Sequence, residues 1–367
     1  MLLGDLGADV IKVEEPGRGD YVRWTPPMVG EFSAAHAVLN RNKRSVTLNL
    51  KHERGPSILK KLVATADILI ESFRPGVMER LGCSYEELAA DNPGLVYTAI
   101  TGYGQDGPYR SRAGHDINYI ATNSTLGTTG QAEGPPVLPS VQVADLSGAM
   151  MAVVGSLAAL VRKARTGEGD FVDISMMDAS LSWLALHLAP WYAGADPLER
   201  GEGVLNGGFP FYRVYRCSDG GYLSVGAIEP QFWSALCTAI GRPELIEQHY
   251  AAGDAQKAVH KALEETFASK SRDEWVGELS GGDTCVAAVN SFEEMAADPQ
   301  VLAREMLVTQ DVGGSELRQL GLALKLANAP GALRLPAPGL GEHNPDIYRE
   351  VDIDDAELAS LASAGAL

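Results

Sequence analysis

The first half of the chain alternates between short β-branched runs and longer segments with helical spacing. Such runs predict strands, and the segments between them predict helices. The predicted strands are residues 8–14, 45–50, 67–71, 95–100 and 170–174, and the predicted helices are residues 1–7, 55–65, 85–90 and 145–165, with one more running through Trp183. This alternation indicates βαβ units and a parallel sheet covered by helices on both faces. Ligands of such sheets bind at the carboxyl ends of the strands.

The clearest helix covers residues 145–165. It has an acid at its start, basic residues in its last turn and Gly167 beyond it. Its middle is apolar nearly all round, so we expect it to be buried. We find no segment with the apolar length of a membrane span and no signal peptide at the N-terminus, so we expect a soluble protein without a membrane partner.

The pattern changes after Gly194. The polar, Gly-rich residues 194–208 predict a linker, and the alternating residues 211–225 contain Asp219-Gly220-Gly221, which predicts a hairpin. This hairpin opens a smaller α+β unit, after which Pro-rich and Gly-rich connections lead to a last helix at residues 354–362. The predicted domains are a large α/β domain over residues 1–190, a small α+β domain over 205–300, and a linker with a C-terminal return to the large domain over 301–367.

Composition limits the possible partners. The 367 residues are 45% hydrophobic and 21% charged, which suits folded cores rather than a disordered chain. A formal net charge of −18 disfavours nucleic acid and anionic membranes, so an anionic ligand needs a local basic cluster. The four cysteines lack the spacing of a disulfide framework or a zinc site, so we expect buried or half-buried thiols and a reducing cytoplasm. The histidines show no ligand spacing, and we predict no metal.

Candidate chemistry lies in two segments. The first is Gly114-His115-Asp116-Ile117-Asn118-Tyr119, and the second begins at Asp145. A histidine exchanges protons near neutrality, and an aspartate at a helix start lies beside free backbone N–H groups that could hold an enolate oxygen. An imidazole and a carboxylate on either side of one carbon could remove its proton and return it. From residue types alone, an ordinary N-cap aspartate and a core histidine are the favoured interpretation.

Nearly the whole chain resembles the family III CoA transferases, a group that includes formyl-CoA transferase and carnitine CoA-transferase. Within this group, residues 114–119 and 226–232 are similar to the α-methylacyl-CoA racemase branch. The supporting segments, in chain order, are residues 4–14, 42–45, 73–76, 102–107, 165–169 and 341–343. The resemblance implies a family III CoA-transferase fold, in which a large parallel-sheet, Rossmann-like domain carries a smaller inserted α+β domain and two chains form an interlocked homodimer.

The resemblance also implies catalytic roles. In the racemases the matching histidine and aspartate form an acid/base pair, so His115 and Asp145 would epimerise C2 of a 2-methylacyl-CoA by 1,1-proton transfer through an enolate. Glu229 would support the histidine from the partner subunit. In the transferases the aspartate is instead a nucleophile that forms a mixed anhydride, so a CoA transferase using Asp145 is the alternative. A second alternative is an inert CoA-binding paralogue.

CoA would be part of the substrate, and no separate cofactor is expected. The resemblance implies that CoA is held by basic side chains, an adenine-contact strand and the GHDINY motif: Lys43, Arg44, Arg74, Leu48, Asn49, Leu50, Lys51, Gly114, Asp116, Ile117, Asn118 and Tyr119. Two positions depart from the racemases, because Glu15 replaces an Arg-like residue and Ser147 replaces a second glycine.

The start of the chain differs from the family pattern. Family members begin with a strand that precedes the helix found here at Met1, so we expect the sheet of this chain to lack its first strand. Open ladder groups would then make the chain less stable than one extended upstream.

Overall fold

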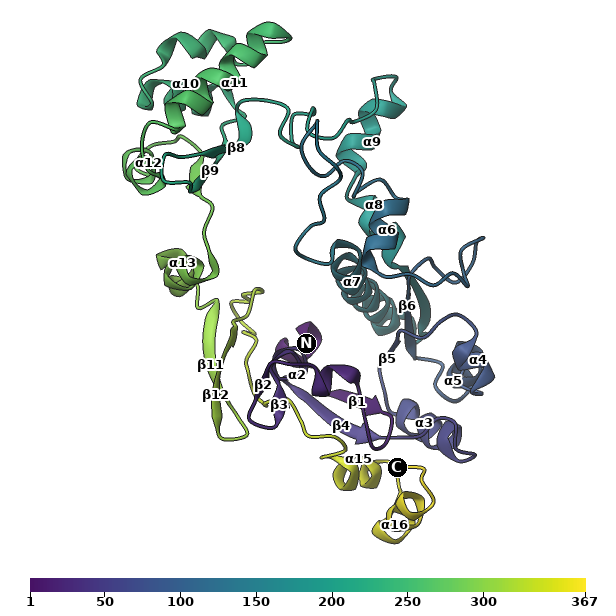
Figure 1. Cartoon of the computed structure of the whole chain (residues 1–367). Coiled ribbons are helices and arrows are strands. Elements are labelled where there is room, and N and C mark those ends of the chain that lie inside the picture. The colour runs from purple at the N-terminus through teal and green to yellow at the C-terminus, as the bar shows by residue number, and fades with distance from the viewer. The chain divides into compact units, whose positions relative to one another are not determined.

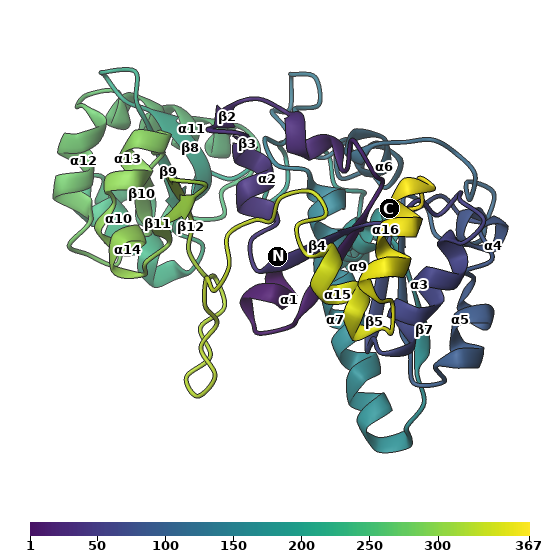
Figure 2. The ribbon, with the colours of Figure 1, turned by 90° about the horizontal axis from the view of Figure 1, so that it is seen from below.

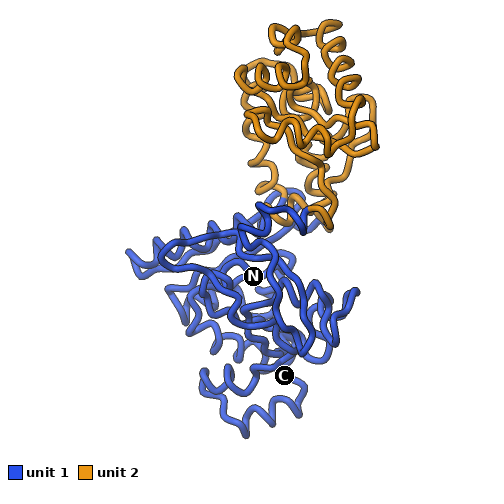
Figure 3. Tube along the Cα trace, turned by 90° about the vertical axis from the view of Figure 1, so that its left-hand side faces the viewer, with its two compact units in different colours: residues 1–112, 148–176, 295–367 blue, residues 113–147, 177–294 orange.

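The computed structural model describes residues 1–367, which form two compact units, coloured separately in Figure 3. Unit 1 contains Met1–Arg112, Gly148–Met176 and Met295–Leu367, and unit 2 contains Ala113–Ser147 and Met177–Glu294. Residues 113–147 and 177–190, which the sequence grouped with the large domain, belong to unit 2. The predicted catalytic pair therefore lies within one unit.

Unit 1 contains two parallel sheets. In the first, β1 (Val10–Glu14) pairs with β4 (Lys43–Thr47). In the second, β6 (Val96–Thr101) lies between β5 (Ile68–Glu71) and β7 (Asp170–Ser175). Most of β6 is buried, as expected for a central parallel strand without polar alternation. These strands confirm the predicted α/β fold with parallel strands.

Helices cover both faces of the β5-β6-β7 sheet, as Figures 1 and 2 show. Helix α7 (Val143–Thr166) lies on one face, and α3 (Gly55–Ala64) and α5 (Tyr85–Asp91) lie on the other. Gly155 allows α7 to approach the sheet, because a Cβ there would lie 2.7 Å from Val172. The buried hydroxyls of Thr98 and Ser156 hydrogen-bond between strand and helix at 2.7 Å.

Two expectations about α7 are wrong. It was expected to be buried, but an apolar stripe along it is exposed: Leu146, Met150, Val154, Leu157 and Val161. The sequence analysis also expects no segment with the apolar length of a membrane span. Helix α7 nevertheless has that length and composition, with a mean hydropathy of 1.7. A core helix can have the same length and composition. The exposed stripe shows that the elements of unit 1 leave part of this helix uncovered.

The C-terminal segment packs against the first strands of unit 1. Helices α15 (Asn344–Glu350) and α16 (Asp355–Ser363) contribute Tyr348 and Leu361 to the core that also contains Val46 and Tyr97. The Tyr348 hydroxyl donates a hydrogen bond to the backbone of Thr47 at 2.7 Å. The other elements of unit 1 are α1 (Leu2–Asp5), η1 (Tyr21–Trp24), β2 (Met28–Val29), β3 (Phe32–Ser33), α2 (Ala34–Leu39), α4 (Val77–Arg80), α14 (Pro299–Ala303), β11 (Leu307–Val312) and β12 (Ser315–Leu320), with α13 (Phe292–Ala297) at the boundary.

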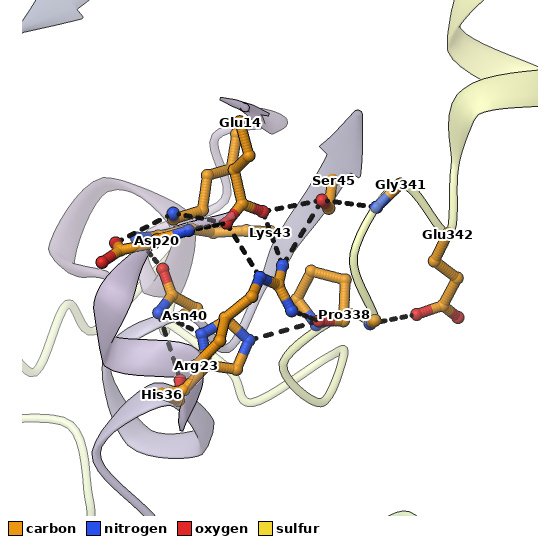
Figure 4. Close-up of polar contacts among 12 residues, drawn as sticks. Glu14, Asp20, Arg23, His36, Asn40, Lys43, Ser45, Pro338, Gly341 and Glu342 are labelled. Carbon is orange, nitrogen blue, oxygen red and sulfur yellow. Dashed lines mark hydrogen bonds and ion pairs between the residues drawn. The ribbon is translucent and has the colours of Figure 1, made fainter. Parts of the chain in front are cut away.

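A buried polar network joins the end of β1 to the loop before α15, as Figure 4 shows. Arg23 donates two hydrogen bonds to the Glu14 carboxylate, at 2.8 and 2.5 Å, and a third to the Pro338 carbonyl at 2.9 Å. Ser45 donates to Glu14 at 2.8 Å and accepts from the Gly341 N–H at 3.1 Å. The network holds the C-terminal return against β1 and β4.

Unit 2 contains the predicted hairpin. Strands β8 (Tyr212–Arg216) and β9 (Tyr222–Gly226) pair antiparallel, and β10 (Val286–Ala288) adds a third strand beside β9. Trp233 and Phe267 are fully buried in the core beneath this sheet. The other elements are α6 (Asp116–Thr122), α8 (Met176–Ser182), α9 (Ala185–Tyr192), α10 (Pro230–Ala239), η2 (Pro243–Gln248), α11 (Asp254–Phe267) and α12 (Arg272–Leu279).

Candidate active site

His115 immediately precedes α6. Its backbone is extended, and its N–H donates a hydrogen bond to the Asn118 side chain at 3.0 Å, which fixes the entry into the helix. The Tyr119 hydroxyl donates to the Gly114 carbonyl at 2.6 Å and holds the residue on the other side of His115. The His115 side chain is exposed. The predicted base is therefore an accessible imidazole on a fixed backbone.

Asp145 lies in the first turn of α7, and Asp116 connects it to the His115 segment. The buried Asp116 carboxylate accepts hydrogen bonds from the backbone N–H groups of Ala144, at 2.6 Å, and Asp145, at 3.2 Å. This contact joins the start of α6 to the start of α7. It also corrects one expectation, because two N–H groups expected to be free for an anion already bind a carboxylate of the chain.

The electrostatic surroundings of Asp145 come from the same segment. Burial raises the pKa of the Asp145 carboxyl, the nearby Asp116 carboxylate raises it further, and His115 opposes both effects. The structure thus brings His115 close enough to Asp145 to act on its carboxyl. Raising the pKa of a carboxyl makes it a stronger base and moves it toward the range in which histidine exchanges protons.

The two residues Ser147 and Gly148, which follow Asp145 in α7, have small side chains, and their contacts explain why. The buried Ser147 hydroxyl donates to the Val143 carbonyl at 2.5 Å, so it is occupied within the helix. Gly148 lies against Met176, where a Cβ would come within 2.6 Å of the methionine side chain. Ser147 in place of a second glycine therefore adds a buried hydroxymethyl group whose hydroxyl donates back to the α7 backbone.

Glu229 immediately precedes α10 in unit 2, and its side chain is exposed. No hydrogen bond or ion pair connects it to His115 or Asp145 within the chain. Its predicted support of the histidine assumes a partner subunit and stays a prediction.

The predicted CoA-binding cations have different surroundings. Arg44 forms ion pairs with Asp9 at 2.5 Å and Glu350 at 2.7 Å, and these carboxylates raise the pKa of its guanidinium. Lys43, on the opposite side of β4, donates to Asn40 at 2.9 Å, and burial followed by the charge of Lys12 lowers its pKa. Both side chains are therefore engaged within the protein.

Arg74 is exposed, forms no ion pair, and lines a cavity of about 290 Å³ in unit 1. The cavity also contains Glu71 and Tyr97, which the sequence analysis missed. Burial raises the pKa of Glu71 to about 7, with opposing hydrogen bonds from the Phe73 N–H and the Tyr97 hydroxyl. The position of Glu71 at the end of a predicted strand was the available signal. Of the predicted cations, Arg74 is the one available to a ligand in this cavity.

The predicted adenine-contact segment follows β4. Leu48 is buried, and the Asn49 N–H donates to the Ala366 carbonyl at 2.8 Å, so the C-terminus packs along this segment. Leu50 is half-buried and Lys51 is exposed. In the GHDINY motif, Ile117 is exposed, whereas Asp116 and Tyr119 are buried in internal contacts.

Comparisons with known proteins agree with this fold. Residues 1–344 match CoA-transferase family III. The chain is 33% identical to human succinyl-CoA:glutarate CoA-transferase, with 100% of this chain and 85% of that protein aligned. It is 34% identical to human α-methylacyl-CoA racemase, with 99% and 91% aligned. A CAIB/BAIF family protein from Brucella suis has a similar crystal structure, with a TM-score of 0.82, 32% identity, and coverage of 96% of this chain and 94% of that one.

Proposed function

Because the chain belongs to CoA-transferase family III, we propose that it epimerises C2 of a 2-methylacyl-CoA, with His115 and Asp145 as the two acid/base residues. The observation that carries the proposal is the pairing of an exposed imidazole with a carboxylate whose pKa is raised, at two helix starts joined by Asp116. A CoA transferase needs the aspartate but no second base opposite it.

The proposed reaction follows from the acidity of the thioester. One residue removes the C2 proton from one face, the thioester carbonyl takes up the charge as an enolate, and the conjugate acid of the other residue returns a proton to the opposite face. Each residue acts as base in one direction and as acid in the other. Arg74 is the cation proposed to bind a CoA phosphate, and CoA remains part of the substrate throughout.

Solvent isotope exchange tests the proposal. The protein is incubated in D₂O with one epimer of a medium-chain 2-methylacyl-CoA, and we expect deuterium at C2 together with the other epimer. His115→Ala should lower this exchange about 10²- to 10⁴-fold, because it removes one of the two proton-transfer groups. His187→Ala, which changes a histidine of α9, is the matched control and should exchange at the rate of the unsubstituted protein. Full exchange by the His115→Ala variant would contradict the assignment.

A CoA transferase with Asp145 as nucleophile is the second candidate, favoured by the 33% identity to a succinyl-CoA:glutarate CoA-transferase over the whole chain. It would transfer CoA to a free carboxylate without C2 exchange, and hydroxylamine would trap the acylated Asp145 as a hydroxamate visible by mass spectrometry. Asp145→Ala should abolish either activity, whereas His115→Ala should spare the transferase.

We further propose that two copies of the chain associate through α7 in the cytoplasm. Four residues of the exposed stripe, Met150, Val154, Leu157 and Val161, follow the alternating four- and three-residue spacing of a helix seam. A symmetric dimer would bury the same stripe on both copies. Val154→Glu should convert a dimer to a monomer in analytical ultracentrifugation, whereas Lys261→Glu on α11 should not. A monomeric unsubstituted protein, or one that binds lipid vesicles through this helix, would contradict this assembly.

A further inference from the structure

Asp116 holds the starts of two helices together with a single oxygen. Its Oδ1 accepts the N–H groups of Ala144, at 2.6 Å, and Asp145, at 3.2 Å, and the residue is only 8% exposed. Since His115 directly precedes Asp116, this contact sets the spacing between the segments that carry the two proposed acid/base groups. The N–H groups of the long helix α7 also provide a favourable setting for a carboxylate anion.

The same contact places a second acid beside Asp145. Asp116 and His115 are the titratable groups that act on the Asp145 carboxyl, with opposite signs. Two neighbouring carboxylates disfavour the simultaneous ionisation of both. Asp116 has two backbone donors, and Asp145 has the exposed side chain. The neighbouring charge therefore increases the proton affinity of the carboxyl that faces solvent.

We propose that Asp116 is a positioning residue for Asp145: it fixes the first turn of α7 against the start of α6 and places a negative charge beside the Asp145 carboxyl. This inference rests on the proposed function for its purpose, but it can be tested without catalysis. The resemblance assigned Asp116 to CoA binding, and that assignment stays a prediction beside this contact with the α7 backbone.

Two substitutions separate the two roles. Asp116→Asn keeps an oxygen that can accept the same N–H groups but removes the charge, whereas Asp116→Ala removes both. The first measurement is an NMR titration of ¹³C-labelled aspartate carboxyls, with Asp145 assigned by its loss in Asp145→Asn. We expect Asp145 to titrate at lower pH in Asp116→Asn. Glu133→Gln, which removes one negative charge from an exposed loop residue, should leave the titration unchanged.

The second measurement is the pH profile of deuterium exchange in the direction in which Asp145 takes the C2 proton. The acid limb of kcat/KM should move to lower pH in Asp116→Asn, because the limb reports the pKa of the essential base. Asp116→Ala should in addition lose roughly 10- to 100-fold in rate at every pH, because the carboxyl is displaced from its reacting position.

The outcomes test the charge role and the positioning role of Asp116 separately. An unchanged Asp145 titration in Asp116→Asn, or an equal shift in Glu133→Gln, would overturn the charge role. Equal rates for Asp116→Ala and Asp116→Asn would overturn the positioning role. Circular dichroism shows whether each variant is folded. An unfolded Asp116→Ala beside a folded Asp116→Asn would support the positioning role, because only the alanine variant loses the contact between the helices. The titration of Asp116→Asn then decides the charge role. A shifted titration without any C2 exchange would support the role of Asp116 and refute the proposed function.

Discussion

Replacing Glu14 by glutamine should destabilise unit 1 strongly. The Glu14 side chain is 2% exposed and lies at the end of β1. Its carboxylate accepts two hydrogen bonds from Arg23, at 2.8 and 2.5 Å, one from Lys12 at 2.9 Å and one from Ser45 at 2.8 Å. A neutral amide cannot balance the two cations, so the substitution leaves Arg23 without an ion-pair partner and leaves Lys12 with Asp20 alone.

The size of the effect follows from the remaining partners. Removing one member of a buried ion pair costs about 3 to 5 kcal/mol. Lys12 keeps its ion pair with Asp20 at 3.0 Å, and Arg23 keeps the Pro338 carbonyl, so we expect the lower end, about 3 kcal/mol. For a unit of roughly 200 residues, each kcal/mol lowers the melting temperature by about 2 to 4 °C, which gives a decrease of about 6 to 12 °C.

The effect should also depend on pH. Burial opposes the charged form of Glu14, but the hydrogen bonds from Arg23, Lys12 and Ser45 outweigh it and hold the pKa of this carboxyl well below its usual range. A lowered pKa gives stability that is complete above the unfolded value, about 4.3, and is lost as the pH falls below it. The difference between the two proteins should therefore be full at pH 7 and should shrink below about pH 4.

Urea unfolding followed by tryptophan fluorescence at pH 7, 5 and 3 provides the measurement. Glu15→Gln is the matched control, because the neighbouring Glu15 carries the same charge on an exposed side chain and should change the unfolding free energy by less than about 0.5 kcal/mol. The double variant Glu14→Leu with Arg23→Met should recover much of the loss, since it removes the buried charge imbalance. Equal effects of Glu14→Gln and Glu15→Gln would refute the reasoning.

Three further predictions concern other parts of the chain. Burial raises the pKa of Glu71 to about 7, so the folded protein is destabilised as the pH rises from about 4.3, the unfolded value, through 7. Glu71→Gln should therefore raise the melting temperature at pH 8 but not at pH 4. Gly169→Ala should cost more than about 4 kcal/mol in urea unfolding, because its Cβ would lie 1.9 Å from the Leu95 carbonyl oxygen, whereas Gly167→Ala, strained at φ +78° but without a clash, should cost about 1 kcal/mol. Cys285 should react with a maleimide in the folded protein, and Cys285→Ser should abolish this fast phase, leaving three buried thiols that react only on unfolding: Cys83, Cys217 and Cys237.

Much of the fold could be predicted from short-range patterns. The parallel strands and the hairpin at Asp219 were found because hydrophobic runs and turn residues report local geometry. Strand β4 begins at Lys43, two positions before its predicted start, because Lys43 and Arg44 pair with β1 although their side chains interrupt the hydrophobic run. The hairpin of β11 and β12 was missed, although Gly313-Gly314 between them was an available turn signal.

The solvent exposure of one cysteine and of one helix could not be predicted from composition. Cys285 was expected to be buried or half-buried, but it is exposed before β10 with φ of 52°. Helix α7 was expected to be buried, because an all-round apolar helix needs a packing partner on every side. Sequence periodicity does not distinguish a partner within the chain from a second copy.

In the candidate site, too, the contacts of single side chains could not be predicted from the sequence. His115 and Asp145 could be selected by residue type and resemblance, but the role of Asp116 depends on a contact between segments that are distant in the sequence. No residue pattern indicates that this carboxylate accepts the N–H groups of α7. Likewise, Arg44 was selected as a free cation, and its ion pairs with Asp9 and Glu350 depend on the folded chain.

The coupling of His115 and Asp145 gives the proposed proton transfer a direction at each step. His115 lowers the pKa of Asp145, so the effect grows when the imidazole gains a proton from the substrate. A protonated Asp145 on the opposite face then becomes a stronger acid at the moment when the enolate requires a proton. The negative charge of Asp116 acts in the reverse step, because it strengthens Asp145 as the base. In the proposed mechanism, the opposing influences on one carboxyl would therefore serve the two directions of the reaction.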